Sequence, residues 1–337
     1  MKILFEKICN IYHLTREAIV KEKISVIVLT YNPSKQKLIA TLKSIIRQEN
    51  VDVQVIISDD GSKENYFEEA KEFLEKNSFT DYKFVSCEKN QGTVKNVIRA
   101  VHVSNGEYVK LISPGDMFTS NNILSGWFNH LIQSKYKWSI CEAIYYKNIN
   151  GCISPIKQPT HPMITDVYEK QQERKCRWNY VILDDIALGA ATICERNLLM
   201  EYLFRINDKV VYAEDNIYRI MMFDGICADY FSGCAIFYEY GEGVSAPGES
   251  VWGERLVKDW SAADLEMLRK LDINDPLQVK ITKILKNNKT GNKYIRDVIK
   301  IMEPGRLKIA LLRKYKMRYS LTEFPEDINA VNWYGDN

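Results

Sequence analysis

Short apolar segments alternate with amphipathic segments along the first third of the chain. Four short runs are rich in β-branched and apolar residues on both faces, as expected of strands that helices cover on both sides. They are ISVIVLT (24–30), VQVIIS (53–58), YKFVSC (82–87) and EYVKLI (107–112). Strands that alternate with helical segments at this spacing predict a parallel, doubly wound α/β sheet.

The segments between these runs predict three helices, over 32–48, 65–77 and 93–104. In the first, Asn32 can cap the helix and Pro33 suits the first helical position. Ligands of doubly wound sheets bind beyond the carboxyl ends of the strands. The polar residues that directly follow each strand are therefore the candidates for a functional site.

The pattern changes after the fourth strand. Asn150-Gly151 between strand-like runs is a hairpin signal, the stretch 184–204 passes from small apolar residues into a helix, and the chain reads as helical from about 255. We expect an N-terminal helix at 1–22, an α/β domain at 23–250 with halves at 23–118 and 119–250, and a basic helical region at 251–337.

The composition is that of an ordinary globular chain. Its 337 residues are 46% hydrophobic and 27% charged, with a net charge of +2. No apolar run approaches the ~18 residues of a membrane span, and the charged first 22 residues do not resemble a secretory signal. The eight cysteines form no CxxC pair and none neighbours one of the four histidines, which argues against zinc. We expect reduced thiols and a cytoplasmic location.

Carboxylates follow the predicted strands at the edge where a ligand would bind. Asp59-Asp60-Gly61-Ser62 follows the second strand, and Ser113-Pro114-Gly115-Asp116 follows the fourth. Asp59 and Asp60 could accept hydrogen bonds from a nucleobase or a ribose, or could cap a helix. A Pro-Gly turn needs no carboxylate, whereas a metal ion that binds a phosphate needs a carboxylate ligand from the protein. Asp116 is therefore a candidate metal ligand.

Three further positions have ordinary structural alternatives. Tyr31 could stack on a base or be a core or rim tyrosine. Gly92 and Lys95 open a helix, where backbone N–H groups and a lysine suit a diphosphate or form an ordinary helix start. Glu214-Asp215 lies at the predicted junction of a short strand and a helix. One carboxylate could be a general base, or both could interact with the helix dipole.

Taken in order, these motifs resemble the family 2 glycosyltransferases. ISVIVLTYN, VIISDDGS, NQGTVKN followed by GEYVKLISPGD, and AEDN occur in the family's order and spacing over about 23–245. The resemblance implies a GT-A fold, a Rossmann-like mixed sheet with helices on both faces, here followed by a C-terminal helical extension. It also implies transfer of a sugar from a nucleotide donor to a hydroxyl with inversion. UDP is the expected nucleotide because it is the family's commonest donor carrier.

The resemblance also implies roles for individual residues. Tyr31 would pack against the base, Asp60 would bind it, and Asp59 would support the turn or the ribose. Asp116 matches the last acid of the family's metal-binding motif, and Asp215 would be the catalytic base with Glu214 orienting the site. The nucleotide-binding positions are Thr30, Tyr31, Asn32, Asp59, Asp60, Gly92 and Lys95.

The expected chemistry needs a divalent cation, Mn²⁺ or Mg²⁺, to neutralise charge on the departing diphosphate. Many family members carry more acids at the Ser113–Asp116 position and a late metal-binding histidine. Here FYEYGEGVS (237–245) has no histidine. Glu239, Glu242 or no second protein ligand are the alternatives. The donor phosphates could also interact with the positive charges of Lys95 and Arg99.

The C-terminal region is strongly basic, with thirteen Lys and Arg and two acids between Lys280 and Arg318. A basic amphipathic helix suits an anionic membrane surface, so we expect peripheral attachment at the inner face of the cell membrane. A solvated face and a dimerisation element are alternatives. Nucleic acid is disfavoured because nothing else resembles a nucleic-acid-binding motif.

The leading hypothesis is a glycosyltransferase that acts on a glycan, lipid-linked or glycoprotein acceptor in bacterial surface glycan synthesis. A sugar nucleotidylyltransferase is an alternative, but the TYNPSKQK stretch after the first strand lacks that class's glycines. A non-catalytic sugar-nucleotide-binding or scaffold protein would explain the reduced metal motif. The Glu214-Asp215 pair argues against that second alternative.

Overall fold

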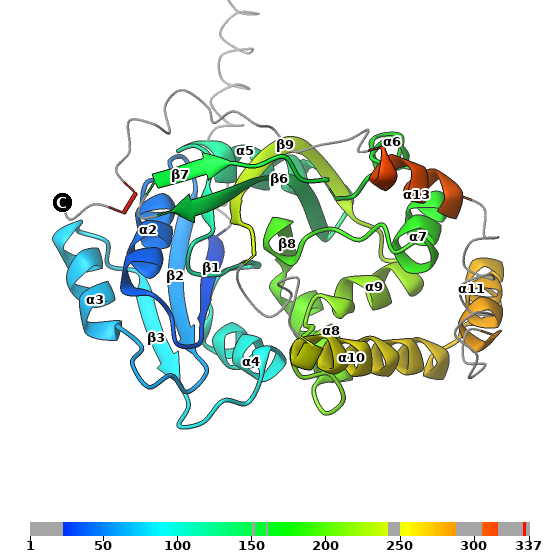
Figure 1. Cartoon of the computed structure of the whole chain (residues 1–337), viewed down its shortest axis with the longest axis horizontal. Helices are drawn as coiled ribbons and strands as arrows, with labels where there is room; N and C mark the ends of the chain where they lie inside the picture. The colour runs from blue at the N-terminus through cyan, green and yellow to red at the C-terminus, as the bar shows by residue number, and fades with distance from the viewer. Residues whose placement is uncertain are drawn as a thin grey trace, which may run out of the picture.

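One mixed sheet runs through the molecule, with helices on both of its faces (Figure 1). The computed structural model describes residues 23–149, 152–159, 161–241, 250–287, 305–315 and 333–334. The strand order is β3-β2-β1-β4-β8-β6-β9-β5, and β7 pairs with β6. The helix expected at 1–22 lies outside the described residues.

The first four strands form the parallel half of the sheet. They are β1 (Lys23–Thr30), β2 (Asp52–Asp59), β3 (Tyr82–Ser86) and β4 (Tyr108–Ile112), and the pairings among these four strands are parallel. They alternate with α2 (Lys35–Ile46), α3 (Phe67–Lys76) and α4 (Thr93–Val103). This confirms the predicted doubly wound arrangement, which places the carboxyl ends of the strands at one edge.

The expected start of the first helix was wrong. The helix begins at Lys35 after Ser34, and Asn32 lies outside it with φ at 47°. The reason is a contact between two strand ends: the Asn32 N–H donates to Ser62 Oγ at 2.6 Å, and the Lys63 N–H donates to Asn32 Oδ1 at 3.2 Å. Asn32 therefore joins two loops at the sheet edge instead of capping the helix.

The second half of the sheet is largely antiparallel. Its strands are β5 (Met117–Phe118), β6 (Trp138–Ile149), β7 (Cys152–Pro155), β8 (Thr192–Glu195) and β9 (Asp229–Glu239). Ile149 pairs opposite Cys152 in antiparallel register, as the hairpin predicted at 150–151 requires. The helical elements are α5 (Ile123–Gln133), α6 (Asp166–Glu169), α7 (Glu173–Ile182), the 3-10 turn η1 (Gly189–Ala191), α8 (Arg196–Ile206) and α9 (Asn216–Phe223).

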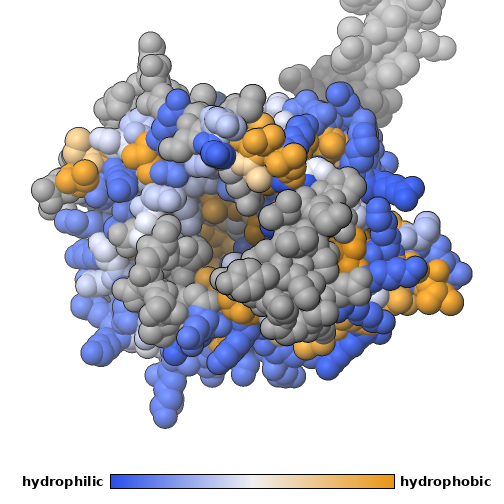
Figure 2. Space-filling model, turned by 45° about the vertical axis from the view of Figure 1, so that its right-hand side comes forward, coloured by the Kyte–Doolittle hydropathy of each residue, from blue (hydrophilic) through white to orange (hydrophobic). Residues whose placement is uncertain are grey.

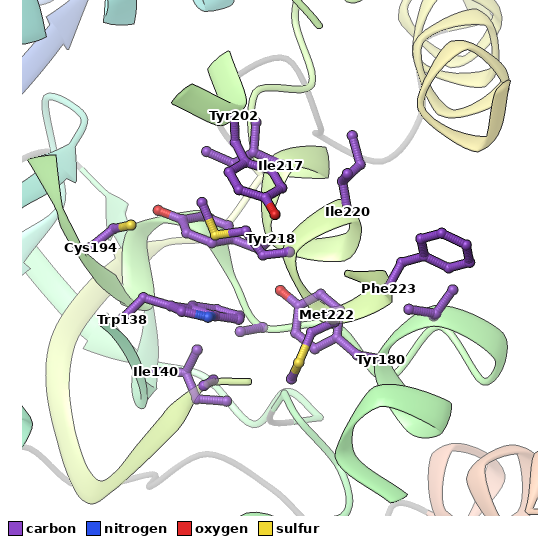
Figure 3. Packing of buried hydrophobic residues seen from close by; sticks show 14 of the residues in the cluster. Trp138, Ile140, Tyr180, Cys194, Tyr202, Ile217, Tyr218, Ile220, Met222 and Phe223 are labelled. Carbon is purple, nitrogen blue, oxygen red and sulfur yellow. The ribbon is translucent and has the colours of Figure 1, made fainter. Parts of the chain in front are cut away.

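The sheet has a separate apolar core on each face. One lies under α2, α3 and α5, and the other under α4, α7, α8 and α9. Figure 3 shows part of the second core, where Trp138 stacks on Tyr218 at 4.8 Å between ring centroids and meets Tyr180 edge-on at 6.0 Å. Aromatic packing of this kind anchors α7 and α9 against β6.

The C-terminal helices share the second core. They are α10 (Ser250–Arg269), α11 (Pro276–Asn287) and α13 (Arg306–Lys314). Met267, Ile281 and Ile309 are buried there, and α10 lies along α8 and α9 (Figure 1). Within the described ranges, no helix combines the length and apolarity needed to cross a bilayer.

Candidate active site

Asp59 organises the turn after β2. Its Oδ1 accepts from the Thr30 hydroxyl at 2.9 Å, and its Oδ2 accepts from the Ser62 N–H at 2.8 Å. The Ser62 hydroxyl donates to the same carboxylate at 2.5 Å. Asp59 is only 1% exposed. Its carboxylate therefore holds the ends of β1 and β2 together, which agrees with the turn-supporting alternative among its expected roles.

Asp60 ties the end of β2 to the loop that precedes α4. Its carboxylate accepts from the Gln91 N–H at 3.1 Å and from the Gly92 N–H at 2.8 Å. Arg99 lies 3.6 Å from it and also donates to the Asp59 carbonyl at 3.2 Å. The guanidinium that could have contacted the donor phosphates is thus bonded within the protein, whereas Lys95 is exposed. Base binding by Asp60 stays a prediction.

Tyr31 lies at the rim of the same edge. It is 52% exposed, and the adjacent Asn32 is bonded to Ser62 and Lys63 on the neighbouring loop. An exposed ring on a braced loop beyond the strand ends can offer a face to a planar base. The space-filling view shows a hollow in one face of the molecule, with apolar residues inside it (Figure 2).

Asp116 lies in a sharp corner after β4. The corner bends at Gly115, whose φ is 103° and where a Cβ would collide with the Glu239 carboxylate. Asp116 Oδ1 accepts from the Glu239 N–H at 3.2 Å, and Glu239 Oε1 lies 2.9 Å from Lys37 Nζ. Burial raises the pKa of Asp116 to about 7. A carboxylate whose charged form is disfavoured by burial gains from a nearby cation.

Two aromatic residues near the C-terminus lie against this corner. Tyr146 donates its hydroxyl hydrogen to the Gly115 carbonyl, and the Tyr334 hydroxyl is 3.0 Å from that of Tyr146. Trp333 packs with Met117 and Tyr146. The sequence patterns did not predict this contact. The aromatic pair in a polar C-terminal stretch was its only signal.

Lys110 is a fully buried cation within β4 that the sequence analysis treated as part of an apolar strand. Its Nζ donates to the Leu111 carbonyl at 2.6 Å and to the Ala190 carbonyl, and it lies 5.9 Å from the Trp127 ring centroid. Burial lowers the pKa of Lys110 to about 8, and the charge of nearby Asp116 opposes this shift. A lysine inside a β-branched run was the available signal.

Glu214 and Asp215 lie in the loop that leads into α9. The short strand predicted before them was wrong, because the N–H groups of 211–213 bond to a carboxylate of α10 instead of to a neighbouring strand. Burial raises the pKa of both acids above the usual range, and the neighbouring Asp215 charge raises that of Glu214 further. Raised carboxylate pKa values are typical of general bases that work near neutral pH.

The turn η1 lies beside both β4 and Asp215. The position of a Cβ on Gly189 would lie 3.6 Å from Asp215 Cβ, and the carbonyl of the next residue, Ala190, binds Lys110, whose charge interacts with Asp116. The structure therefore joins the end of β4 to the start of α9 through a single short turn, although these segments are about a hundred residues apart in the sequence.

The carboxylates of Asp116 and Glu239 suit a metal site in which a bound diphosphate and water supply the remaining ligands. In the parts of the chain that the structure describes, no three His, Cys, Asp or Glu side chains gather as a metal cluster. Asp116 and Glu239 would supply hard oxygen ligands of the kind that Mg²⁺ or Mn²⁺ prefers, if phosphate oxygens and water completed the shell. They fit a cation shared with a diphosphate, and Glu242 lies outside the described residues.

Comparisons with known proteins indicate the class of protein that the chain resembles. Residues 25–125 match the family model of glycosyl transferase family 2. An uncharacterized glycosyltransferase of Mycoplasma pneumoniae, the MG060 homolog, is 30% identical over 103 residues, which are 30% of this chain and 34% of that protein. The chain thus matches about a third of the length of this curated relative.

Two solved structures share the fold. One is S. aureus TarS 1-349 in complex with UDP-GlcNAc, with a TM-score of 0.52, 18% identity, and coverage of 79% of this chain and 72% of that one. The other is the mannosyltransferase PcManGT from Pyrobaculum calidifontis in complex with GDP-Man and Mn²⁺, with a TM-score of 0.52, 14% identity, and coverage of 87% and 84%. Residues 25–125 therefore resemble glycosyl transferase family 2, and the chain has a mixed α/β fold of the GT-A type.

The buried Lys110 makes stability depend on pH. Its folded pKa of about 8 lies below the ~10.4 of an unfolded lysine. Between these values the unfolded chain binds the proton that the folded chain has released. The contribution of Lys110 to the free energy of unfolding should therefore rise with pH, by about 1–3 kcal/mol. Urea unfolding at pH 8 and pH 10 should show that Lys110→Met lacks this rise.

The control is Lys76→Met, which removes an exposed lysine. It should keep the wild-type dependence on pH. An identical dependence in Lys110→Met and the wild type would contradict the burial of a titrating amine.

Proposed function

We propose that this chain transfers a sugar from a nucleotide donor, expected to be a UDP-sugar, to a hydroxyl of a glycan, lipid-linked or glycoprotein acceptor, with inversion. The observation that carries the proposal is that η1 lies beside both β4, the strand that leads to Asp116, and Asp215. Glu214 and Asp215 have raised pKa values, and Asp116 lies at the end of β4 beyond the parallel strands. A bacterial surface glycan is the proposed context of the acceptor.

The relatives support the donor class. Of the two solved structures with this fold, one is a complex with UDP-GlcNAc and the other a complex with GDP-Man and Mn²⁺. In the present chain the exposed Tyr31 would stack on the base, with Thr30, Asn32, Asp59 and Asp60 shaping the edge around it. Gly92 and Lys95 lie at the start of α4, where the Lys95 ammonium is free to reach toward a diphosphate.

Asp215 is the proposed catalytic base. It accepts the proton of the acceptor hydroxyl while the oxygen forms a bond to the anomeric carbon of the sugar. The bond from that carbon to the diphosphate oxygen breaks on the opposite side, so the configuration inverts. The neighbouring carboxylate of Glu214 interacts with that of Asp215 through charge repulsion. Its proposed role is to orient the acceptor or the base.

Asp116 and Glu239 would hold a divalent cation, Mn²⁺ or Mg²⁺. When bound, the cation would neutralise charge on the leaving nucleoside diphosphate. Lys37, which lies 2.9 Å from Glu239 Oε1, supplies a fixed positive charge to the same corner. The Tyr146 hydroxyl donates a hydrogen bond to the Gly115 carbonyl. This bond fixes the backbone of the corner that carries Asp116.

The base assignment predicts a defined kinetic defect. Asp215→Asn should lower kcat by about 10²–10⁴-fold, because the amide cannot take the acceptor proton, while donor affinity stays near that of the wild type. Rates with an active donor–acceptor pair and donor titrations measure the two effects. Asp208→Asn, which changes an exposed acid before the same loop, is the matched control. A wild-type rate of transfer in Asp215→Asn would show that Asp215 is not the catalytic base.

The metal assignment predicts a binding defect. Calorimetry with UDP should give binding that needs Mn²⁺ in the wild type and is weakened about tenfold or more in Asp116→Ala, because a charged ligand is lost. Asp52→Ala, at an exposed acid outside the edge, is the control. Equal Mn²⁺-dependent affinity in both variants would count against Asp116.

The second candidate is a non-catalytic sugar-nucleotide-binding protein. It is favoured by the presence of a single acid in Ser113–Asp116 and by the absence of a three-residue metal cluster among the residues the structure describes. Under this alternative the donor binds but no sugar is transferred to any acceptor. The same calorimetry combined with a transfer assay separates the two candidates.

We also propose that the 280–318 region binds an anionic membrane surface from the cytoplasmic side. Of this region the structure describes parts of α11 and α13. Leu307 and Leu311 of α13, and Tyr315 directly after it, are 61%, 42% and 64% exposed. They recur every four residues, so they share one face. Exposed lysines of the same helix would contact lipid headgroups. An oligomer is compatible with the same surface, and nucleic acid is not proposed.

Membrane attachment predicts cosedimentation with vesicles that contain anionic lipid and not with purely zwitterionic vesicles. Leu307→Gln with Leu311→Gln should reduce the bound fraction several-fold, because each leucine contributes apolar area to the interface. Ile273→Gln, at a 77% exposed residue between α10 and α11, is the control. Equal sedimentation of both variants would exclude α13 as the contact.

A further inference from the structure

The loop before the proposed base is held by a side chain from α10. Asp259 is only 4% exposed. Its Oδ1 accepts from the Val211 N–H at 3.1 Å, and its Oδ2 accepts from the Tyr212 N–H at 2.8 Å and the Ala213 N–H at 3.0 Å. Three successive backbone donors thus converge on one carboxylate, directly before Glu214 and Asp215.

These bonds replace the secondary structure that the loop lacks. Buried N–H groups need acceptors, and an ionised carboxylate is a stronger acceptor than a neutral carbonyl. The end of the loop is fixed in turn, because the Ala213 carbonyl accepts from the Asn216 side chain at 3.0 Å at the start of α9. The residues that carry the pair are therefore tied both to α10 and to α9.

The same loop contacts the nucleotide side of the edge. The Val94 N–H donates to the Val211 carbonyl at 3.1 Å, and a Cβ at Gly92, whose φ is 91°, would collide with Val211. The Gly92 N–H donates to Asp60. A continuous series of contacts therefore runs from Asp60 through Gly92 and Val211 to Asp259.

We propose that Asp259 is a positioning residue, which fixes the 211–213 backbone so that Asp215 is held at a set distance from the donor side of the site. Its effect on catalysis rests on the proposed glycosyl transfer, whereas its effect on the loop does not. The residue lies on α10, beyond the 25–125 segment that matches the family model.

The Asp259 charge acts on the pair as well as on the backbone. It contributes to the raised pKa of both Glu214 and Asp215, after burial as the main cause. Tyr180 of α7 and Tyr218 of α9 also face the pair, and burial raises the pKa of both phenols, so they stay neutral. Arg255 of α10 lies over the Tyr212 ring at 5.6 Å.

Hydrogen exchange tests the positioning without any substrate. Exchange of the 211–213 amides in the full chain should be about tenfold or more faster in Asp259→Asn than in the wild type, because an amide presents one acceptor oxygen instead of two. Asp264→Asn is the matched control, since it loses a 2.6 Å contact from the same helix to Arg219 of α9. Its 211–213 amides should exchange at the wild-type rate.

Unchanged exchange of these amides in Asp259→Asn would overturn the proposal. If this variant does not fold, Asp259→Glu keeps the charge and moves it by one methylene, and it should show a smaller increase confined to the same amides. Faster exchange across the whole chain in Asp259→Glu would also overturn it, because the residue would then be a general stabiliser.

Kinetics test the consequence for transfer. Asp259→Asn should lower kcat about tenfold or more and leave the donor KM near the wild-type value. It should also shift the acid limb of the kcat–pH profile to lower pH, because the lost negative charge no longer raises the pKa of the pair. Asp264→Asn should change neither. Equal losses in both variants without a pH shift would refute the role, whereas a wild type that transfers no sugar would refute the proposed function and leave the exchange result standing.

Discussion

Buried carboxylates that accept backbone N–H groups hold the loops of this protein in place. Asp60 accepts from two residues of the loop before α4, Asp116 from Glu239, Asp185 from Met163 and Ile164, and Asp259 from three residues before Glu214. Loops at a sheet edge leave donors that no strand can satisfy. A charged acceptor satisfies several of them at once, so segments far apart in sequence are joined at one edge.

The acids of the candidate site fall into two sets that differ in their surroundings. Asp59 and Asp60 are bonded to several protein donors, and they shape the loops beside the exposed Tyr31. Burial raises the pKa of Asp116, Glu214 and Asp215. A group whose charge is poorly compensated inside the protein gains most from a cation or a proton brought by a ligand. This contrast supports assigning the chemistry to the second set.

Sequence patterns predicted the parallel half of the sheet closely, because each of its strands is a short β-branched run followed by a helical period. The patterns failed where a contact from elsewhere replaced a local preference. Asn32 bonds to the loop after β2 instead of capping α2, and 211–213 bond to Asp259 instead of forming a strand. Lys110 was read as part of an apolar strand because its partner Ala190 lies 80 residues away.

The sequence by itself determined the resemblance to the family 2 glycosyltransferases, the order of the strands and helices in the parallel half, and the acids that stand at the candidate site, since periodicity and residue type are local properties. Only the tertiary structure decided which acids are bonded within the protein and which have raised pKa values. It also showed that α10 reaches back to the loop before Asp215 and that Trp333 lies against the Asp116 corner. Burial and hydrogen-bond partners depend on contacts between distant segments, which no local pattern encodes.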